Sequence, residues 1–258
     1  MIHVHPVPAF SDNYLWVIHD GHHAAVVDPG DAQPVLDYLA ASQLTLTAIL
    51  CTHHHADHVG GVDAILDELK LRGSIPVYGP ANERIPARTH ALREGDCISL
   101  PELAMKFEVL DVPGHTAGHI AYVGHNLLIC GDTLFACGCG RLFEGTAAQM
   151  TASLSKLKRL PGHTKVYCAH EYTMANIKFA EAVEPDNADL KLRKAFCAAK
   201  RHRNEPTVPS TIALELATNP FLRWDVDAVI ATAEKRAGHA LKDDNEIFAV
   251  IREWKNKS

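Results

Sequence analysis

One short stretch constrains this chain more than any other. Residues 52–58 read Thr52-His53-His54-His55-Ala56-Asp57-His58. The apolar run 48–51 before it is short enough for a buried strand, and the apolar residues between 62 and 69 after it repeat at helical spacing. The histidines are therefore predicted to lie in a strand-to-helix turn. His53 and His55 would project to the same side of an extended segment, and Asp57 and His58 would turn towards a neighbouring point as the helix begins. This arrangement favours two adjacent metal ions over a histidine-rich surface loop.

Three other strand-like segments end in a side chain that can bind a metal. The apolar segment 107–112 is followed by His115, the segment 127–130 by Asp132, and the segment 166–169 by His170. Side chains at strand ends can converge on one rim of a sheet, and the loops that leave a rigid sheet often contain the binding and catalytic residues. A backbone-satisfied core histidine would explain His115 or His170 taken alone. Because all these strand ends agree with the 52–58 stretch, a shared metal site is the better interpretation.

The donor set predicts the chemistry. The proposed ligands are His53, His55, Asp57, His58, His115, Asp132 and His170. Imidazoles and carboxylates suit zinc, and also iron or manganese. A single structural zinc ion closes with about four ligands, so this larger set fits two divalent ions about 3.5–4 Å apart, bridged by a carboxylate and a solvent oxygen. Asp132 is the natural bridge. Metal binding lowers the pKa of water to about 7 and polarises a carbonyl, which predicts a metallohydrolase. No serine nucleophile motif is present.

Composition limits the alternatives. The chain has 258 residues, 47% hydrophobic and 22% charged, which is ordinary for a globular protein of one large or two unequal domains. No apolar run approaches the roughly 18 residues that span a bilayer, and the first residues show no secretory signal, so a cytoplasmic location is expected. The net charge of −6 argues against nucleic acid as a partner.

The seven cysteines are an odd number, which fits reduced thiols in a reducing compartment. A Cys137-x-Cys139 pair could bind a metal, but it lies between glycines without a second cysteine pair, so this role is disfavoured.

The predicted secondary structure changes near residue 172, from strands and helices to helices. Before it, strands are predicted at 14–18, 24–27 and 122–123, with helices at 34–41 and 150–160. Asp28 ends its strand in a turn, where it could either orient a metal-binding histidine or serve as an ordinary turn carboxylate. Beyond 172 only helices are predicted, at 174–183, 188–202, 211–217, 226–237 and 245–254. The helix at 188–202 is expected to bury a face containing Leu190, Leu192, Phe196 and Cys197 and to expose its basic residues, rather than to form an anion-binding patch.

The motif T-H-x-H-x-D-H, followed by His115, Asp132 and His170, resembles the metallo-β-lactamase superfamily. Within it, three further features resemble glyoxalase II, the hydroxyacylglutathione hydrolases. They are the stretch 131–146, GDTLFACGCGRLFEGT; the stretch 169–173, AHEYT; and a helical C-terminal part with Asn219-Pro220-Phe221 and Arg252-x-x-Lys255. The resemblance extends from about Pro8 to Lys255.

The resemblance implies a four-layer αβ/βα metallo-β-lactamase sandwich at 1–172 and an all-helical substrate-binding domain at 173–258. It implies hydrolysis of S-D-lactoylglutathione and related 2-hydroxyacyl glutathiones by a metal-bridged hydroxide, giving D-lactate and glutathione, the second step of methylglyoxal detoxification. It places His53, His55 and His115 on one ion, Asp57, His58 and His170 on the other, and Asp132 between them, with Asp57 and Asp132 as catalytic residues.

Glutathione would be bound through positions that correspond to Arg141, Phe143, Tyr172, Arg252 and Lys255. Eukaryotic members tend to have Lys and Tyr where this chain has Arg141 and Phe143, so one hydrogen bond to the substrate is missing here. Arg252 and Lys255 are spaced to share one helix face and are expected to be partly exposed.

Other functions remain open at this stage. A persulfide dioxygenase of the same superfamily would use one iron ion, which the complete second ligand set disfavours. A β-lactamase would normally be exported. A non-catalytic metal-binding module would not need the cationic pair near the C-terminus. The expected partner is a small glutathione thioester, with no nucleic acid and no membrane, and a monomer is expected.

Overall fold

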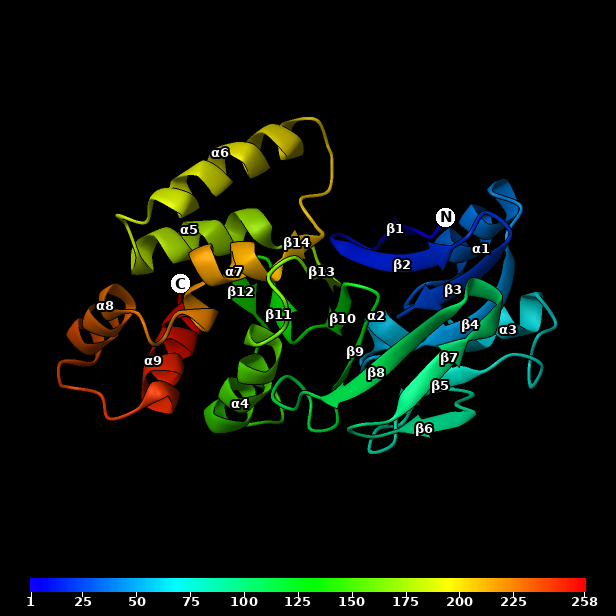
Figure 1. Ribbon diagram of the computed structural model, residues 1–258, viewed down its shortest axis with the longest axis horizontal. Helices are drawn as coiled ribbons and strands as arrows, with labels where there is room; N and C mark the ends of the chain where they lie inside the picture. Colours follow the sequence, from blue (N-terminus) through cyan, green and yellow to red (C-terminus); the bar gives the residue numbers. More distant parts are fainter. The chain divides into compact units, whose positions relative to one another are not determined.

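The computed structural model describes all 258 residues (Figure 1). The chain forms two compact units. The first unit comprises residues 1–111 and 116–131, and the second comprises 112–115 and 132–258. The strands belong to two six-stranded sheets and one two-stranded ribbon. None of the helices has both the length and the apolar character needed to cross a bilayer.

The first sheet lies entirely in the first unit. Its strands follow chain order: β1 (His3–Ala9), β2 (Asn13–His19), β3 (His23–Val27), β4 (Thr45–Leu50), β5 (Val77–Pro80) and β6 (His90–Leu92). The first three strands are antiparallel, and β3 to β6 are parallel. The strands predicted at 14–18, 24–27 and 48–51 are confirmed. β1 was not predicted. It contains Pro6 and Pro8, which are tolerated because β1 is an edge strand.

Helices α1 (Ala32–Ala41) and α3 (Val62–Glu68) bury their apolar stripes in the core of this unit. Val35 and Leu39 of α1 and Ile65 of α3 share a hydrophobic cluster with Val26 and Ile49 of the sheet. The parallel pair β3 and β4 ends in register, with Val27 opposite Leu50. Asp28 and the 52–58 stretch therefore leave the sheet at the same rim, and the short helix α2 (Ala56–Val59) begins within that stretch.

The rest of the first unit is an antiparallel run of four strands. They are β7 (Cys97–Leu100), β8 (Met105–Asp111), β9 (Ile120–Gly124) and β10 (Leu127–Gly131), with the 3₁₀ helix η1 (Pro101–Leu103) after β7. The strands predicted at 107–112, 122–123 and 127–130 are confirmed, and β7 was not predicted. Phe107 and Val109 of β8 are buried and alternate with exposed Lys106 and Glu108, as a half-buried strand requires.

The second unit contains the remaining elements. The strands are β11 (Leu134–Phe135), β12 (Gly138–Cys139), β13 (Lys165–Cys168) and β14 (Ser210–Thr211). The helices are α4 (Ala147–Lys158), α5 (Thr173–Val183), α6 (Ala188–His202), α7 (Ile212–Thr218), η2 (Pro220–Leu222), α8 (Asp227–Ala237) and α9 (Asp244–Asn256). All helices predicted beyond 172 are confirmed. α4 begins three residues earlier than predicted, after a capping box formed by Thr146 and Gln149.

The predicted buried face of α6 is wrong in part. Leu190 and Cys197 are buried, but Leu192 is 71% exposed and Phe196 is 63% exposed. Arg193 is buried instead. It lies three residues after Leu190 and four before Cys197, so the three side chains share one face of the helix. Its guanidinium donates to Glu215 at 2.5 Å and to Thr218 and Ser210 at 2.6 and 3.0 Å. A charged residue occupies a core position because a buried carboxylate pairs with it.

Candidate metal centre

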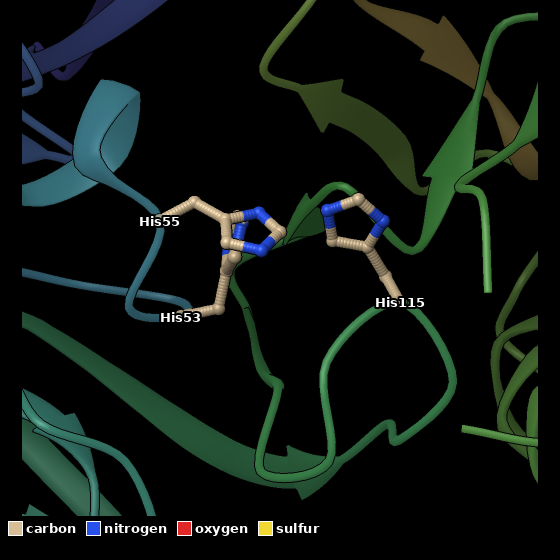
Figure 2. Close-up of side chains that lie close together, drawn as sticks. All are labelled: His53, His55 and His115. Carbon is tan, nitrogen blue, oxygen red and sulfur yellow. Dashed lines mark hydrogen bonds between the residues drawn. The ribbon is translucent and has the colours of Figure 1, made fainter. Parts of the chain in front are cut away.

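The 52–58 stretch forms the predicted strand-to-helix turn and brings its donors together. The Nε2 atom of His53 lies 3.1 Å from Nδ1 of His55, with the two rings nearly perpendicular (Figure 2). The ligand atoms of His53 and His58 lie within 4.8 Å of each other. Because α2 begins at Ala56, Asp57 and His58 turn inward, and Asp57 Oδ2 lies 3.4 Å from His58 Nε2. Imidazole nitrogens this close together can share an ion.

Asp28 fixes this turn from the neighbouring strand. Its carboxylate accepts hydrogen bonds from the backbone N–H and the hydroxyl of Thr52, both at 2.7 Å, and lies 3.1 Å from Nδ1 of His58. Occupying Nδ1 fixes the ring so that Nε2 serves as the metal-binding atom. Of the two roles left open for Asp28, this contact supports the one in which its carboxylate orients a histidine. The backbone of Asp28 is left-handed, with φ of 47°, a conformation in which Asp is enriched.

Three side chains around the turn were missed by the sequence analysis. Asn13, the first residue of β2, donates to Asp57 Oδ2 at 3.0 Å. Glu83 is buried and lies 2.9 Å from Nδ1 of His54, and it also accepts from the backbone N–H of Gly118 at 2.9 Å. His119 stacks on His53 with ring centroids 4.5 Å apart. Glu83 lies in a stretch without periodicity, so no pattern could have indicated it.

The second unit carries the other predicted donors. Asp132 Oδ2 lies 3.4 Å from Nε2 of His115 and 3.4 Å from Nε2 of His170, and all three side chains are buried. His115, on the loop after β8, is drawn in Figure 2. Its Nδ1 lies 2.9 Å from the carbonyl oxygen of Arg141, so Nδ1–H donates there and Nε2 keeps its lone pair. These side chains therefore bring one carboxylate oxygen and two imidazole nitrogens together.

The predicted substrate-binding residues differ in exposure. Arg141 is exposed, Phe143 is 61% exposed with its ring 5.2 Å from that of His115, and Tyr172 is 37% exposed and stacks on His170 at 4.7 Å. The expectation that Arg252 is partly exposed is wrong: it is buried, because its guanidinium donates to the carbonyl of Cys139 at 2.9 Å and covers the ring of Phe221.

Lys255 is half-buried, with its ammonium nitrogen 5.0 Å from the centre of the Phe179 ring. Burial, and next the positive charge of Arg252, lower the pKa of Lys255 to about 8. This ammonium therefore loses its proton at a lower pH than an ordinary lysine.

Side chains of the C-terminal helices hold the backbone that follows Asp132. Asn219 donates to the carbonyls of Phe135 and Gly138 at 3.1 and 2.9 Å, and Asn176 donates to the carbonyl of Ala136 at 3.0 Å. Glu215 accepts from the backbone N–H of Cys137 at 2.9 Å. We call residues 132–141, held in this way, the Asp132 loop. Sequence analysis did not assign this role to Asn176, Glu215 or Asn219.

The donors fit divalent metal ions. Groups of histidine and aspartate side chains bring their ligand atoms within 4.8 Å of one another, and imidazole with carboxylate accepts zinc, iron or manganese. The two cysteines of the Asp132 loop do not add to the set. Burial raises the pKa of Cys137 to about 12 and also raises that of Cys139, whereas a thiol binds a metal as the thiolate.

Comparison with known proteins covers the whole chain. Residues 10–170 match the metallo-beta-lactamase superfamily, and residues 171–258 match the family described as hydroxyacylglutathione hydrolase C-terminus. The chain is 56% identical over 256 residues to a hydroxyacylglutathione hydrolase of Nitrosomonas eutropha, covering 99% of both chains. It is 57% identical over 264 residues to one of Cupriavidus taiwanensis, again covering 99% of both. Among solved structures, ETHE1 from Myxococcus xanthus matches with a TM-score of 0.66 and 25% identity over 98% of this chain and 91% of that one.

Proposed function

The chain belongs to the hydroxyacylglutathione hydrolase (glyoxalase II) family of the metallo-β-lactamase superfamily, and from this premise we propose how its residues carry out the reaction. The expected fold is confirmed as the metallo-β-lactamase fold with two mixed sheets and a C-terminal helical region. Its activity is that of a hydroxyacylglutathione hydrolase. The proposed substrate is S-D-lactoylglutathione, which yields D-lactate and glutathione in the second step of methylglyoxal detoxification.

The two His/Asp clusters are proposed to form one binuclear centre. His53, His55 and His115 would hold the first ion, Asp57, His58 and His170 the second, and Asp132 both. The observation that carries this proposal is the position of Asp132 Oδ2, 3.4 Å from both His115 and His170. Zinc is the preferred metal, with iron or manganese as alternatives. When bound, two divalent ions would lower the pKa of a water molecule to about 7 and polarise the thioester carbonyl.

The chain's own residues would orient the reacting groups and move the proton. Asp28 holds Nδ1 of His58 at 3.1 Å, and Asn13 holds the carboxylate of Asp57 at 3.0 Å, so the donors are ordered before the substrate arrives. The Asp57 side chain is 41% exposed and is proposed to accept the proton of the attacking water. Cleavage of the C–S bond releases glutathione thiolate, a good leaving group because thiols ionise near pH 8.5.

Glutathione carries two carboxylates, and a chain of net charge −6 needs local cations to bind it. Arg141 and Lys255 are proposed to supply them, with Tyr172 and Phe143 lining the same substrate. Arg252 is buried against Cys139, so its proposed role is to position the Asp132 loop and to set the charge environment of Lys255. On this basis we propose a catalytic domain at 1–172 and a substrate-binding domain at 173–258.

All seven cysteines are free thiols, which supports a reducing, cytoplasmic compartment. We propose that the protein acts there as a monomer on a small-molecule substrate.

The direct test is thioester hydrolysis by the purified protein. S-D-lactoylglutathione should be cleaved with release of free thiol, a chelator should abolish the activity, and zinc should restore it. Elemental analysis of the active protein should find about two ions per chain. Oxygen consumption with glutathione persulfide and no thioester cleavage would support the persulfide dioxygenase instead. One tightly held ion in a fully active protein would refute the binuclear centre.

A further inference from the structure

Three histidines occupy one face at the outer end of the β1–β2 pair. His3 of β1 lies directly opposite His19 of β2, and His5 is two residues further along β1. Alternate residues of a strand point to the same side, so His3 and His5 share a face. Val7 and Val17 lie further along on this face, where they pack in the core cluster with helix α1. The histidines therefore lie on the same face of the sheet as these core residues, next to them at the end of the strand pair.

The strand positions of these histidines allow their rings to reach a single tetrahedral ion. Opposed residues on antiparallel strands have Cβ atoms about 4.5–5.5 Å apart, and residues two apart on one strand are separated by about 7 Å. The rings of His3 and His19 are already stacked, with centroids 5.4 Å apart, and His5 stacks on Tyr38 of α1 at 4.3 Å. Because His3 and His5 are exposed, their rings can turn towards a shared ion at little cost in packing.

His19 is prepared as a ligand by its surroundings. Its Nε2 atom lies 3.3 Å from the hydroxyl of Tyr38, and its Nδ1 atom is buried without a hydrogen-bond partner. When Nε2–H donates to Tyr38, Nδ1 keeps a lone pair, and metal-binding histidines usually have the other ring nitrogen bonded in this way. Burial lowers the pKa of His5 and of His19, and His3 and His5 lower that of His19 further against the opposing effect of Asp20. The neutral imidazole that binds metals is therefore favoured.

We propose that His3, His5 and His19 bind one divalent transition-metal ion, with zinc as the probe metal and water in the fourth position. A donor set of three imidazoles suits zinc, copper or nickel rather than magnesium or calcium. This site is separate from the catalytic donors. Asn13, which bonds to Asp57, begins β2 and His19 ends it, about 20 Å away along the strand. An ion here would join the edge strand β1 to β2 and α1.

Zinc binding by the loaded enzyme tests the proposal. Untagged protein with its catalytic metals in place is dialysed against a chelator-buffered zinc series, and bound metal is measured by elemental analysis. The wild type should hold one zinc ion more than the double variant His3→Asn/His5→Asn. The control His239→Asn removes an exposed histidine outside the cluster and should match the wild type. Thioester hydrolysis should be equal in all of them, since none of these residues belongs to the catalytic site.

Thermal unfolding gives a second readout. Added zinc should raise the melting temperature of the wild type and of His239→Asn but not of the double variant, because a ligand that binds only the folded state stabilises it. Tyr38→Phe should weaken zinc binding by about 10–100-fold while leaving the number of ions at saturation unchanged. Equal zinc content and equal thermal shifts in the wild type and the double variant would overturn the site. Unchanged affinity in Tyr38→Phe would overturn the proposed orientation of His19.

Discussion

The 52–58 stretch and the Asp132 loop both present metal donors, but they are fixed in different ways. The first has four proposed donors within residues 53–58, and it is held by Asp28, which follows β3, and by Asn13, which begins β2. The Asp132 loop has one donor, and its backbone is held by side chains of α5 and α7, by Asn219 and by Arg252 of α9. A compact motif needs a few local supports, whereas the Asp132 loop depends on a fold completed much later in the chain.

The largest effect is expected from replacing Asp132, the proposed bridging ligand. Asp132→Ala should abolish thioester hydrolysis and lower metal content at both sites, because a lost bridge disturbs two ions. His170→Ala should mainly loosen one ion. Elemental analysis and turnover are measured on the same samples. Full metal content and activity in Asp132→Ala would contradict the bridging role.

The support of the Asp132 loop can be broken at Glu215. Glu215→Gln leaves the guanidinium of Arg193 buried without its carboxylate, which should lower the free energy of unfolding by about 3–5 kcal/mol. The measurement is urea denaturation. The matched control is Glu181→Gln, which removes an exposed ion pair with Lys194 at 2.8 Å and should cost less than about 1 kcal/mol. Equal losses in the two variants would show that the buried network does not stabilise the loop.

The support of the 52–58 stretch should respond differently. Asp28→Asn keeps the size of the side chain but removes the charge facing His58, so metal affinity should fall by about 10–100-fold. Competition with a chelator measures this loss. Global stability of the metal-loaded protein should change less than in Glu215→Gln. If Asp28→Asn unfolds the protein as readily while retaining its metal, the contrast between the two loops is wrong.

Substrate binding should depend on pH through Lys255. Since the pKa of Lys255 is lowered to about 8, its charge, and with it the attraction for glutathione carboxylates, is present below pH 8 and lost above it. KM should therefore rise as pH passes 8, with kcat little changed. Lys255→Gln should raise KM up to about tenfold at pH 7 and remove this rise. A KM profile that is the same in both proteins would exclude Lys255 from substrate binding.

The lowered pKa of Lys255 should also make the stability of the folded protein depend on pH. Between pH 8 and the ordinary lysine value of 10.5, the unfolded chain binds more protons at Lys255 than the folded protein does. This residue's contribution to stability should therefore rise with pH across that interval and be constant below it. Denaturation of the wild type and Lys255→Gln at several pH values isolates the difference.

The smallest effect is expected at Phe143, where eukaryotic members of the family tend to have Tyr. Phe143→Tyr adds a hydroxyl to a side chain that is 61% exposed. One new hydrogen bond contributes about 0.5–1.5 kcal/mol, and the exposure of this side chain places the gain at the lower end, so KM should fall by about two- to threefold. The substitution leaves the metal donors unchanged, and equal metal content is the control. An unchanged KM would place the substrate away from this ring.

The sequence by itself predicted the candidate metal donors and the helices of the C-terminal part. The candidate donors His53, His55, Asp57 and His58 lie within one short stretch, and the apolar patterns before and after it predict a strand-to-helix turn. His115, Asp132 and His170 each follow a strand with a clear apolar pattern. An apolar pattern indicates which side of a segment is buried, and it can be recognised within that segment without knowledge of the fold.

Only the tertiary structure decided which polar residues are buried. Arg193 was predicted on a solvent-exposed helix face and Arg252 was expected to be partly exposed. Both are buried, because Glu215 and the carbonyl of Cys139 accept hydrogen bonds from them. Glu83 and Asn13 were missed for the same reason. Burying a charge is unfavourable unless a partner is present, and the partner is known only when the chain has folded.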